Sequence, residues 1–479
     1  MVEERGIDLK KVLFLTALAV AVALAAARTG EFSPAEQAAL NRISAESLRA
    51  NLSYLASDDL EGRKTPSAGL DRAADYIASQ FQKNGLEPAA AGHSYFQTAQ
   101  FDDSTPDLTG FKLVMKSGDA QVDVPVKEIR AQTLAALNLE DARVTVLPGN
   151  GAIPPVAGVA VAGLFDRYGD EALLEELQSR KPALILLVDK SGRNRPASDF
   201  LDDLDLHHAP VIRIRDSAAA DLLRRGRSLT ISLHLAPPAV KQVSLRNVAG
   251  LLPGSDPALR DQYVLLTAHY DHLGRSTRGI FNGANDNASG TVSVIEIGSA
   301  LATLNPRPKR SILFMTFFGE EEGLLGSYYY AHSPLVPLAK TVADVNLEQM
   351  GRTDEQSGTR LLSFTFTGPS YSNLPAIMSA AAKTEGIGTW QLQDADAYFS
   401  RSDNYAFALR GMIAHTIAVA AEFPDYHGPG DKADKIDYAN MAKVDRGVAA
   451  GVLRIADDPA PPRWSDAKGA ATYRAAAEK

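Results

Sequence analysis

From Asn247 onward, apolar runs with the length of strands alternate with segments of helical periodicity. The runs "YVLLTAHYD", "RSILFMTFF", "TVADVNLEQM" and "GMIAHTIAVA" are almost continuously apolar, whereas "GTVSVIEIGSALATL" and "NLPAIMSAAAKTEG" are long enough for helices. Strands that are buried on both faces have this composition, because helices cover both sides of their sheet. The sequence therefore predicts an α/β fold with a mostly parallel mixed sheet and helices on both faces.

Residues that can bind metal occur at five places on one predicted edge of the sheet: after four of these strands and in the glycine-rich turn that opens a helix. In open α/β sheets, ligands bind beyond the carboxyl ends of the strands. The polar residues found there are His269, Asp271, His272, Asp286, Glu320, Glu321, Glu322, Glu348, Asp425, Tyr426 and His427. A single carboxylate after a strand is commonly a helix N-cap or a solvated loop residue. Five such positions on one edge favour a functional site instead.

Two imidazoles and three carboxylates make up the predicted ligand set: His269, Asp286, Glu321, Glu348 and His427. This composition suits two divalent ions, each with a terminal histidine and a terminal carboxylate, that share one bridging carboxylate. Imidazole and carboxylate ligands favour zinc, with cobalt or manganese as substitutes. A water between two such ions is acidified and serves as the expected nucleophile. Glu320, beside a ligand, is the candidate general base that passes the water's proton to a leaving amine.

We expect structural roles for Glu322 and for the remaining histidines. Glu322 is expected to be solvated or to cap a helix. Hydrogen-bonded structural roles are expected for the histidines that lack an accompanying ligand motif: His93, His207, His208, His234, His332 and His415.

The N-terminus predicts export. A polar start that ends in two lysines precedes the apolar run "VLFLTALAVAVALAAA", so residues 1–27 are a predicted signal peptide with cleavage after Ala27. An uncleaved membrane anchor is the alternative, although the run is short for a span. The chain has no cysteine, which excludes disulfides and a lipid-modified N-terminal cysteine. We expect a bacterial periplasmic or secreted protein with no stable membrane association after signal removal.

The mature chain divides into four segments by pattern. Residues 28–105 are helical: Ser33 and Pro34 predict a helix start, and Gly85 closes a second amphipathic helix. Short alternating runs predict a β-rich domain at 106–240, with one helix in "DEALLEELQSR". Residues 241–457 carry the candidate site, and 458–479 form a Pro- and Ala-rich tail that we expect to be loosely ordered.

The composition limits the classes of partner that the protein is expected to bind. Apolar residues make up 45% of the 479 residues, as in a globular protein with a large core and two or three units. The net charge of −9, without a basic stripe, argues against nucleic acid as a partner. The sequence gives no indication of oligomeric state.

The motifs "AHYDHLG", "GANDNASG", "GEEEGLLGS", "NLEQMGR" and "DYHGPGD" resemble, in this order, the zinc aminopeptidases typified by secreted bacterial leucine aminopeptidases, peptidase family M28. The helices at 28–105 are also similar to those that precede the catalytic core in that family. The β-rich segment looks like the protease-associated domain that many members carry. The resemblance implies a phosphorylase/hydrolase-like zinc exopeptidase core that acts on peptide substrates.

The resemblance also implies individual roles. His269 and Glu348 would bind one zinc, Glu321 and His427 the other, and Asp286 would bridge them. Asp271 would orient His269, and Tyr426 would stabilise the tetrahedral oxyanion through its hydroxyl. Arg401 would position substrate and Asp403 would support the site, with an ordinary surface ion pair as the alternative for both.

One position departs from the family. Aspartate usually stands where this chain has Glu348, which is one methylene longer. The longer side chain puts the affinity of that metal in question and could reshape the place where a substrate amine binds.

The sequence therefore predicts an exported enzyme with two zinc ions that removes N-terminal residues from peptides. Carboxypeptidase or dipeptidase action within the same family is the first alternative. A glutaminyl-cyclase-like acyltransferase with one zinc is the second, and a non-catalytic receptor-like module is the third.

Overall fold

The computed structural model describes residues 32–147, 153–165, 177, 180–189, 209–225 and 228–478. They fall into two compact units: the described parts of Met1–Gln97, Arg246–Glu320 and Gly326–Lys479 form one, and those of Thr98–Leu245 with Glu321–Leu325 form the other. The predicted signal peptide, most of the predicted helix at 170–180, and His207 and His208 lie outside the described residues. Among the described helices, none has the length and apolarity needed to cross a membrane.

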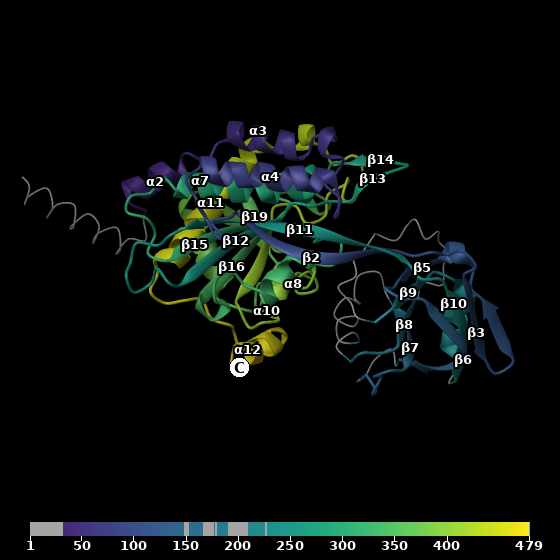
Figure 1. Ribbon diagram of the computed structural model, residues 1–479. Helices are drawn as coiled ribbons and strands as arrows, with labels where there is room; N and C mark the ends of the chain where they lie inside the picture. The colour runs from purple at the N-terminus through teal and green to yellow at the C-terminus, as the bar shows by residue number, and fades with distance from the viewer. Residues whose placement is uncertain are drawn as a thin grey trace, which may run out of the picture. The chain divides into compact units, whose positions relative to one another are not determined.

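A nine-stranded mixed sheet forms the centre of the first unit (Figure 1). Its four middle strands are parallel neighbours, in the order β15 (Ser311–Phe317), β12 (Tyr263–His269), β16 (Thr341–Glu348) and β21 (Ala414–Ala418). Antiparallel pairs flank this centre, β11 with β15 and β19 with β21. The outer strands are β1 (Glu87–Pro88), β2 (Phe96–Thr105), β11 (Ala239–Leu252), β19 (Ser363–Phe366) and β20 (Gly388–Thr389). The parallel centre within a mixed sheet confirms the predicted fold class.

Helices cover both faces of this sheet. In Figure 1, α2, α3, α4, α7 and α11 lie on one side, and α8, α10 and α12 lie on the other. The helix bounds are α2 (Pro34–Leu40), α3 (Ala45–Leu55), α4 (Ala68–Lys83), α7 (Gly290–Leu301), α8 (Leu325–His332), α9 (Leu374–Thr384), α10 (Asn404–Ala408), α11 (Tyr438–Asp457) and α12 (Ala471–Ala477).

The N-terminal helices begin and end where the sequence predicts. Ser33 and Glu36 form a reciprocal capping box at α2, with Pro34 at the first helical position. The Ser67 side chain caps α4 by accepting from the Leu70 amide. Gly85, with φ of +79°, follows the C-cap of α4 in the left-handed region.

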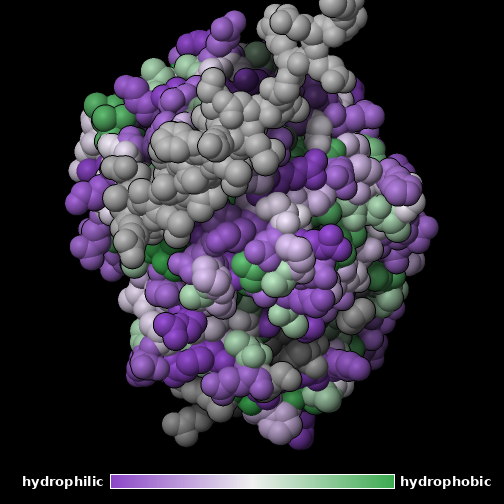
Figure 2. Space-filling view, turned by 90° about the vertical axis from the view of Figure 1, so that its left-hand side faces the viewer, coloured by the Kyte–Doolittle hydropathy of each residue, from purple (hydrophilic) through white to green (hydrophobic). Residues whose placement is uncertain are grey.

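The apolar runs of the middle strands form the core. Every residue of β15 is buried, as expected for a strand covered on both faces. Leu313, Met315 and Phe317 pack with Tyr330 of α8 and Phe407 of α10 in one cluster. Burial of these large side chains supplies much of the driving force for folding. On the face shown in Figure 2, hydrophilic side chains dominate and apolar ones are scattered.

The second unit is built on an eight-stranded mixed sheet in the order β4-β3-β10-β6-β7-β8-β9-β5. Its middle pairs β6/β7, β7/β8 and β8/β9 are parallel, and the other pairs are antiparallel. The bounds are β3 (Lys112–Ser117), β4 (Ala120–Asp123), β5 (Ile129–Gln132), β6 (Leu137–Val146), β7 (Ala160–Phe165), β8 (Leu184–Asp189), β9 (Val211–Ile214), α6 (Ser217–Arg225) and β10 (Leu229–Leu235). The chain enters this unit within β2 and leaves it within β11.

The C-terminal segment, expected to be loosely ordered, packs against the rest of the first unit. Trp464 pairs with Ser372 in an isolated β-bridge and donates its indole N–H to the Gly411 carbonyl at 2.9 Å. Its ring stacks on Tyr473 of α12, with 5.5 Å between centroids. The two half-buried aromatic residues supply packing contacts that the Pro and Ala content of the segment did not suggest.

His415 on β21 has the structural role expected for it. Its ring is completely buried and bonds to the Ser372 hydroxyl at 2.7 Å and the Thr367 carbonyl at 2.9 Å. Burial disfavours the charged imidazole and lowers the pKa of His415 to about 4.

This pKa predicts a pH dependence of stability. The unfolded chain takes up a proton near pH 6.5, whereas folded His415 stays neutral until about pH 4, so the free energy of unfolding falls as the pH drops through this window. The full difference corresponds to about 3 kcal/mol. The stability gap between wild type and His415→Gln, measured by urea unfolding of metal-free protein, should therefore narrow from pH 7.5 to pH 4.5. A gap that does not change with pH would contradict the assignment, and exposed His332→Gln is the control.

Candidate metal centre

The predicted ligands come together at the carboxyl ends of the parallel strands. His269 is the last residue of β12, Glu348 is the last residue of β16, and Glu320 and Glu321 follow β15. Asp286 lies in the turn Ala284–Ser289 that leads into α7. Parallel strands end at the same edge of a sheet, so His269 and Glu348, which are 79 positions apart in sequence, converge there.

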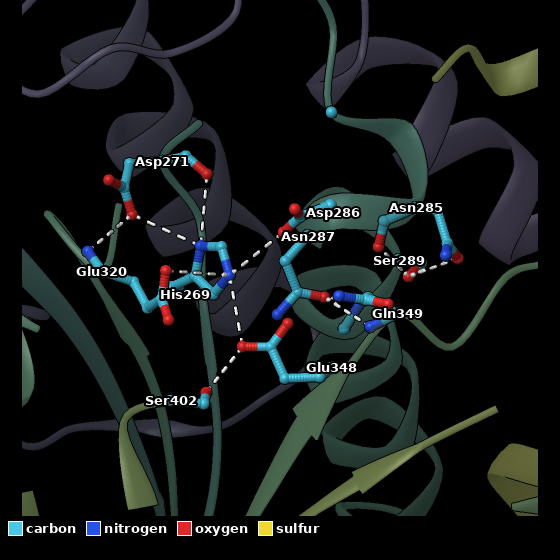
Figure 3. A network of polar contacts seen from close by, with 12 residues as sticks. His269, Asp271, Asn285, Asp286, Asn287, Ser289, Glu320, Glu348, Gln349 and Ser402 are labelled. Atoms are coloured by element: carbon cyan, nitrogen blue, oxygen red, sulfur yellow. Dashed lines mark hydrogen bonds and ion pairs between the residues drawn. The ribbon is translucent and has the colours of Figure 1, made fainter. Parts of the chain in front are cut away.

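His269 lies at the centre of this cluster (Figure 3). Its Nε2 is 3.2 Å from Glu348 Oε1, 3.5 Å from Asp286 Oδ1 and 3.9 Å from Glu320 Oε2. On the other side of the ring, Nδ1 is 3.4 Å from Asp271 Oδ1. The imidazole is 1% exposed, so one nitrogen faces three buried or half-buried carboxylates and the other faces a fourth. Asp271 thus lies where it can fix the tautomer that leaves Nε2 available to a metal.

Asp286 connects this cluster to the loop that carries His427. Its Oδ1 faces His269, and its Oδ2 is 3.1 Å from His427 Nε2. The Asp286 amide donates to Asp431 at 3.0 Å, and the neighbouring Asn285 amide donates to the same carboxylate. The two carboxylate oxygens of Asp286 therefore point at two different histidines, which is the arrangement needed for a shared ligand.

The donor set fits divalent metal ions. Two groups of side chains offer ligand atoms that lie within 4.8 Å of one another: His269 with Glu320 and Glu348, and His272 with Asp286 and Glu321. Imidazole and carboxylate donors at this spacing suit zinc. The first group contains both ligands predicted for one ion. The predicted pairing of Glu321 with His427 is not one of the two groups in the described residues, and it stays a prediction.

The shifted pKa values of His269 and Asp286 indicate that the site favours positive charge. Burial alone would lower the pKa of His269, but the charges of Glu348 and Glu320 and the bonds to Asp271 and Asp286 raise it well above its ordinary value. Burial raises the pKa of Asp286, but hydrogen bonds from His269 and from His427 lower it well below its usual range. The surrounding carboxylates thus favour positive charge at His269, and a metal ion that binds there should displace protons.

A pocket of about 570 Å³, including space open to solvent, lies over these residues. Its polar floor includes His269, Asp286, Glu320, Glu348 and His427. The rest of its wall is lined by Gln349, Thr365, Thr367, Leu392, Tyr398, Arg401, Ser402, Thr416, Ala418, Ala421 and Tyr426. A concave site with convergent charged groups at a sheet edge is where a substrate is expected to bind.

The predicted catalytic and substrate residues are placed around this pocket. Tyr426 lines it and stacks on His427 with ring centroids 4.0 Å apart. The Arg401 guanidinium also lines it and lies 4.6 Å from the centre of the Tyr398 ring. Asp403, by contrast, is completely buried, so a surface ion pair does not describe it. Burial raises the pKa of Asp403 to about 7.

Glu322 differs from its expectation. Its exposed fraction is 6%, so it is neither solvated nor at a helix N-cap. The chain turns at residues 321–323, shortly after β15 ends at Phe317, and α8 begins only at Leu325. The turn keeps the third glutamate inside the protein.

Several residues that hold the ligands were not singled out from the sequence. The Ser402 hydroxyl donates to Glu348 Oε1 at 2.7 Å, and the Thr65 hydroxyl donates to Asp271 Oδ2 at 3.3 Å. The Asn287 side chain bonds to the Leu347 carbonyl at 2.8 Å, which ties the Asp286 turn to the end of β16. His272 also has no predicted role, although it lies near Asp286 and Glu321. The signal for it in the sequence is the spacing of three residues between His269 and His272 at the end of β12.

The Ser402 contact predicts an effect on metal binding. The hydroxyl orients a carboxylate that lies 3.2 Å from His269, and loss of such a partner costs about 10–100-fold in metal affinity. Ser402→Ala should therefore weaken zinc binding by that factor in a chelator competition titration. Ser379→Ala on α9 is the control, since that hydroxyl bonds only within its own helix. Unchanged affinity in a folded Ser402→Ala variant would contradict the expected role.

Comparison with known proteins agrees with this geometry. Residues 247–452 match the model of Peptidase family M28. This segment belongs to peptidase family M28. It contains all of the candidate metal ligands, and it corresponds to the resemblance inferred from the motifs.

Relatives of this M28 segment include aminopeptidases and other proteases. Aminopeptidase YwaD of Bacillus subtilis is 31% identical over 195 residues, which cover 40% of each protein. A vacuolar membrane protease of Verticillium alfalfae is 28% identical over 199 residues, 41% of this chain and 18% of that protein. The chain thus spans less than two thirds of the length of these curated relatives. The aminopeptidase from Aneurinibacillus sp. strain AM-1 has the same fold, with a TM-score of 0.58 at 20% identity over 88% of this chain and 96% of that one.

Proposed function

We propose that this protein is a zinc-dependent exopeptidase that holds two zinc ions and removes residues from the N-terminus of peptides. The observation that carries the proposal is the convergence of His269, Asp286, Glu320 and Glu348 on the floor of one pocket, at the carboxyl edge of an M28 sheet. In the proposed arrangement, His269 and Glu348 would hold one zinc, and Asp286 would be a ligand of both ions.

The second zinc would be held by Glu321 and His427. His427 already lies 3.1 Å from the shared carboxylate, which supports its part in the site. His272 offers a further donor near Asp286 and Glu321. Zinc pairs at such sites acidify a water molecule and polarise the scissile carbonyl.

The chain's own residues would then move the proton and stabilise charge. Glu320 lies in the pocket with its side chain 13% exposed, so it can reach a water there while staying partly desolvated. Its backbone amide is held by Asp271 at 3.1 Å, which fixes the start of the side chain. We propose that Glu320 takes the proton of the attacking water and gives it to the leaving amine. Tyr426 would donate its hydroxyl to the oxyanion that forms on the substrate.

The relatives support the choice of the N-terminal end. YwaD and a leucine aminopeptidase 2 of Arthroderma otae, 24% identical over 286 residues, are named as aminopeptidases. Leu392, Ala418 and Ala421 contribute apolar surface to the lining of the pocket. An apolar side chain of medium size would bury apolar surface there, so we propose uncharged, aliphatic N-terminal residues as substrates.

Three further predictions accompany this proposal. The signal peptide, the bacterial export and the protease-associated identity of the β-rich unit remain proposals that rest on the N-terminal sequence and on the motif resemblance. No described helix could span a membrane, and the predicted signal lies outside the described residues.

The test compares three forms of one peptide that begins with leucine: unmodified, N-acetylated and C-terminally amidated. An aminopeptidase should release leucine from the unmodified and the amidated peptide and should not cleave the acetylated one. Cleavage that requires a free C-terminus would instead indicate a carboxypeptidase, and a requirement for both free ends a dipeptidase. A peptide with N-terminal glutamine completes the set, because cyclisation without hydrolysis would indicate the acyltransferase alternative.

A further inference from the structure

Arg63 lies outside the M28 segment but is buried next to it. Its exposed fraction is 0%, which is unusual for a permanently charged side chain. It belongs to the turn Glu61–Arg63 after the short helix Asp58–Leu60, and all three residues of this turn have positive φ.

The guanidinium of Arg63 spans the two loops that carry His269 and Asp286. Nε donates to the Tyr270 carbonyl at 2.7 Å, directly after His269. Nη1 donates to the Asn282 carbonyl at 2.7 Å, and Nη2 donates to the Gly283 carbonyl at 2.9 Å, three residues before Asp286. A further bond from Nη1 to the Leu55 carbonyl anchors the same group to the end of α3.

The backbone around Arg63 is fitted to the same loops. The Arg63 carbonyl accepts from the His272 amide at 3.3 Å, and the Gly62 carbonyl accepts from the Gly274 amide at 3.1 Å. A Cβ atom at Gly62 would lie 2.3 Å from the Phe281 carbonyl oxygen, so only glycine permits this approach. The segment therefore packs directly on the hairpin β13 (Gly274–Ser276) and β14 (Gly279–Phe281), which connects the two loops.

We propose that Arg63 is a positioning residue of the metal site, which fixes the separation of His269 and Asp286 by clamping the loops that carry them. The guanidinium suits this role because its planar fork holds several carbonyl oxygens at fixed angles. A lysine would keep the charge but would place a single ammonium at one point, so it could not reach both loops. The inference builds on the proposed metal site.

The test compares Arg63→Lys with Arg310→Lys. Arg310 is also 0% exposed and donates to the Ile455 carbonyl at 2.8 Å and the Pro459 carbonyl at 3.1 Å, where it joins the start of β15 to the end of α11. Both variants weaken a buried carbonyl clamp, but only Arg63 contacts the ligand loops. Zinc affinity is measured by chelator competition, and hydrogen exchange of the metal-free proteins is measured over residues 270–286.

Arg63→Lys should lower zinc affinity by about 10–100-fold and raise exchange within residues 270–286, as loss of an outer support does. Arg310→Lys should leave both quantities at the wild-type level. A folded Arg63→Lys protein with wild-type affinity and exchange would overturn the proposal, and so would an equal loss of affinity in Arg310→Lys. If wild type binds no zinc, the proposed function fails, whereas the exchange measurement on metal-free protein still tests the clamp.

If Arg63→Lys does not fold, Thr65→Val tests whether this segment positions the metal site. The variant keeps the size of the side chain and removes the hydroxyl that bonds to Asp271 from the same segment. It should raise exchange at residues 270–286 and lower zinc affinity. A folded Thr65→Val protein that is unchanged in both measurements would count against a positioning role for this segment.

Discussion

Glu320→Gln is expected to lower peptide hydrolysis by about 10²–10⁴-fold while zinc content stays at the wild-type level. The amide has nearly the same shape as the carboxylate but cannot accept the proton of the attacking water. Glu320 lines the pocket and lies 3.9 Å from His269 Nε2, so the substitution acts beside the proposed metal ligands. Hydrolysis of a leucine peptide and elemental analysis of the same sample measure the two quantities.

The control for this variant is Glu46→Gln on the exposed side of α3, which removes one negative charge far from the pocket. It should retain wild-type activity. If Glu320→Gln binds zinc and hydrolyses peptides at nearly the wild-type rate, Glu320 is not the general base. If the variant loses zinc, Glu320 is itself a metal ligand. Its position beside His269 and Glu348 would permit that role.

Asp286→Asn should have the largest effect on metal content. Asp286 is 3% exposed and directs one oxygen at His269 and the other at His427, so its loss affects both proposed ions. Asparagine removes the charge and one of the two oxygen donors. We expect the zinc content to fall from two ions to one or none per chain, and hydrolysis to disappear. The loss of zinc affinity should exceed the roughly 100-fold loss that follows removal of a residue that only supports a ligand.

Native mass spectrometry counts the ions in Asp286→Asn, and circular dichroism checks that the variant is folded. Asp466→Asn, at an exposed position in the C-terminal segment, is the matched control and should retain both ions. A folded Asp286→Asn protein that still holds two zinc ions would rule out the bridging role.

The sheet and the strand ends could be predicted because they depend on local pattern. The run that forms β15 is apolar at nearly every position, and this composition requires cover on both faces. Once the strands are parallel, the residues after β12, β15 and β16 must meet at one edge. The convergence of His269, Glu320 and Glu348 follows from that rule alone.

Contacts between distant segments could not be predicted in the same way. Ser402 touches Glu348 and Arg63 touches Tyr270 only because of how loops fold back on the sheet, and no periodicity encodes such pairs. The burial of Glu322 has the same origin, since a tight turn at 321–323 replaced the expected exposed loop. The order of the C-terminal segment depends on the contacts of one residue, Trp464, with Tyr473 and with the Gly411 carbonyl. The Pro and Ala content of the segment does not indicate these contacts.

Diffraction from zinc-loaded crystals, recorded on both sides of the zinc absorption edge, locates the proposed zinc ions. We expect two anomalous peaks about 3.5–4 Å apart in the pocket, with Asp286 between them. One peak should lie beside His269 and Glu348, and the other beside Glu321 and His427. A single peak, or zinc bound away from Asp286, would contradict the proposed two-zinc site.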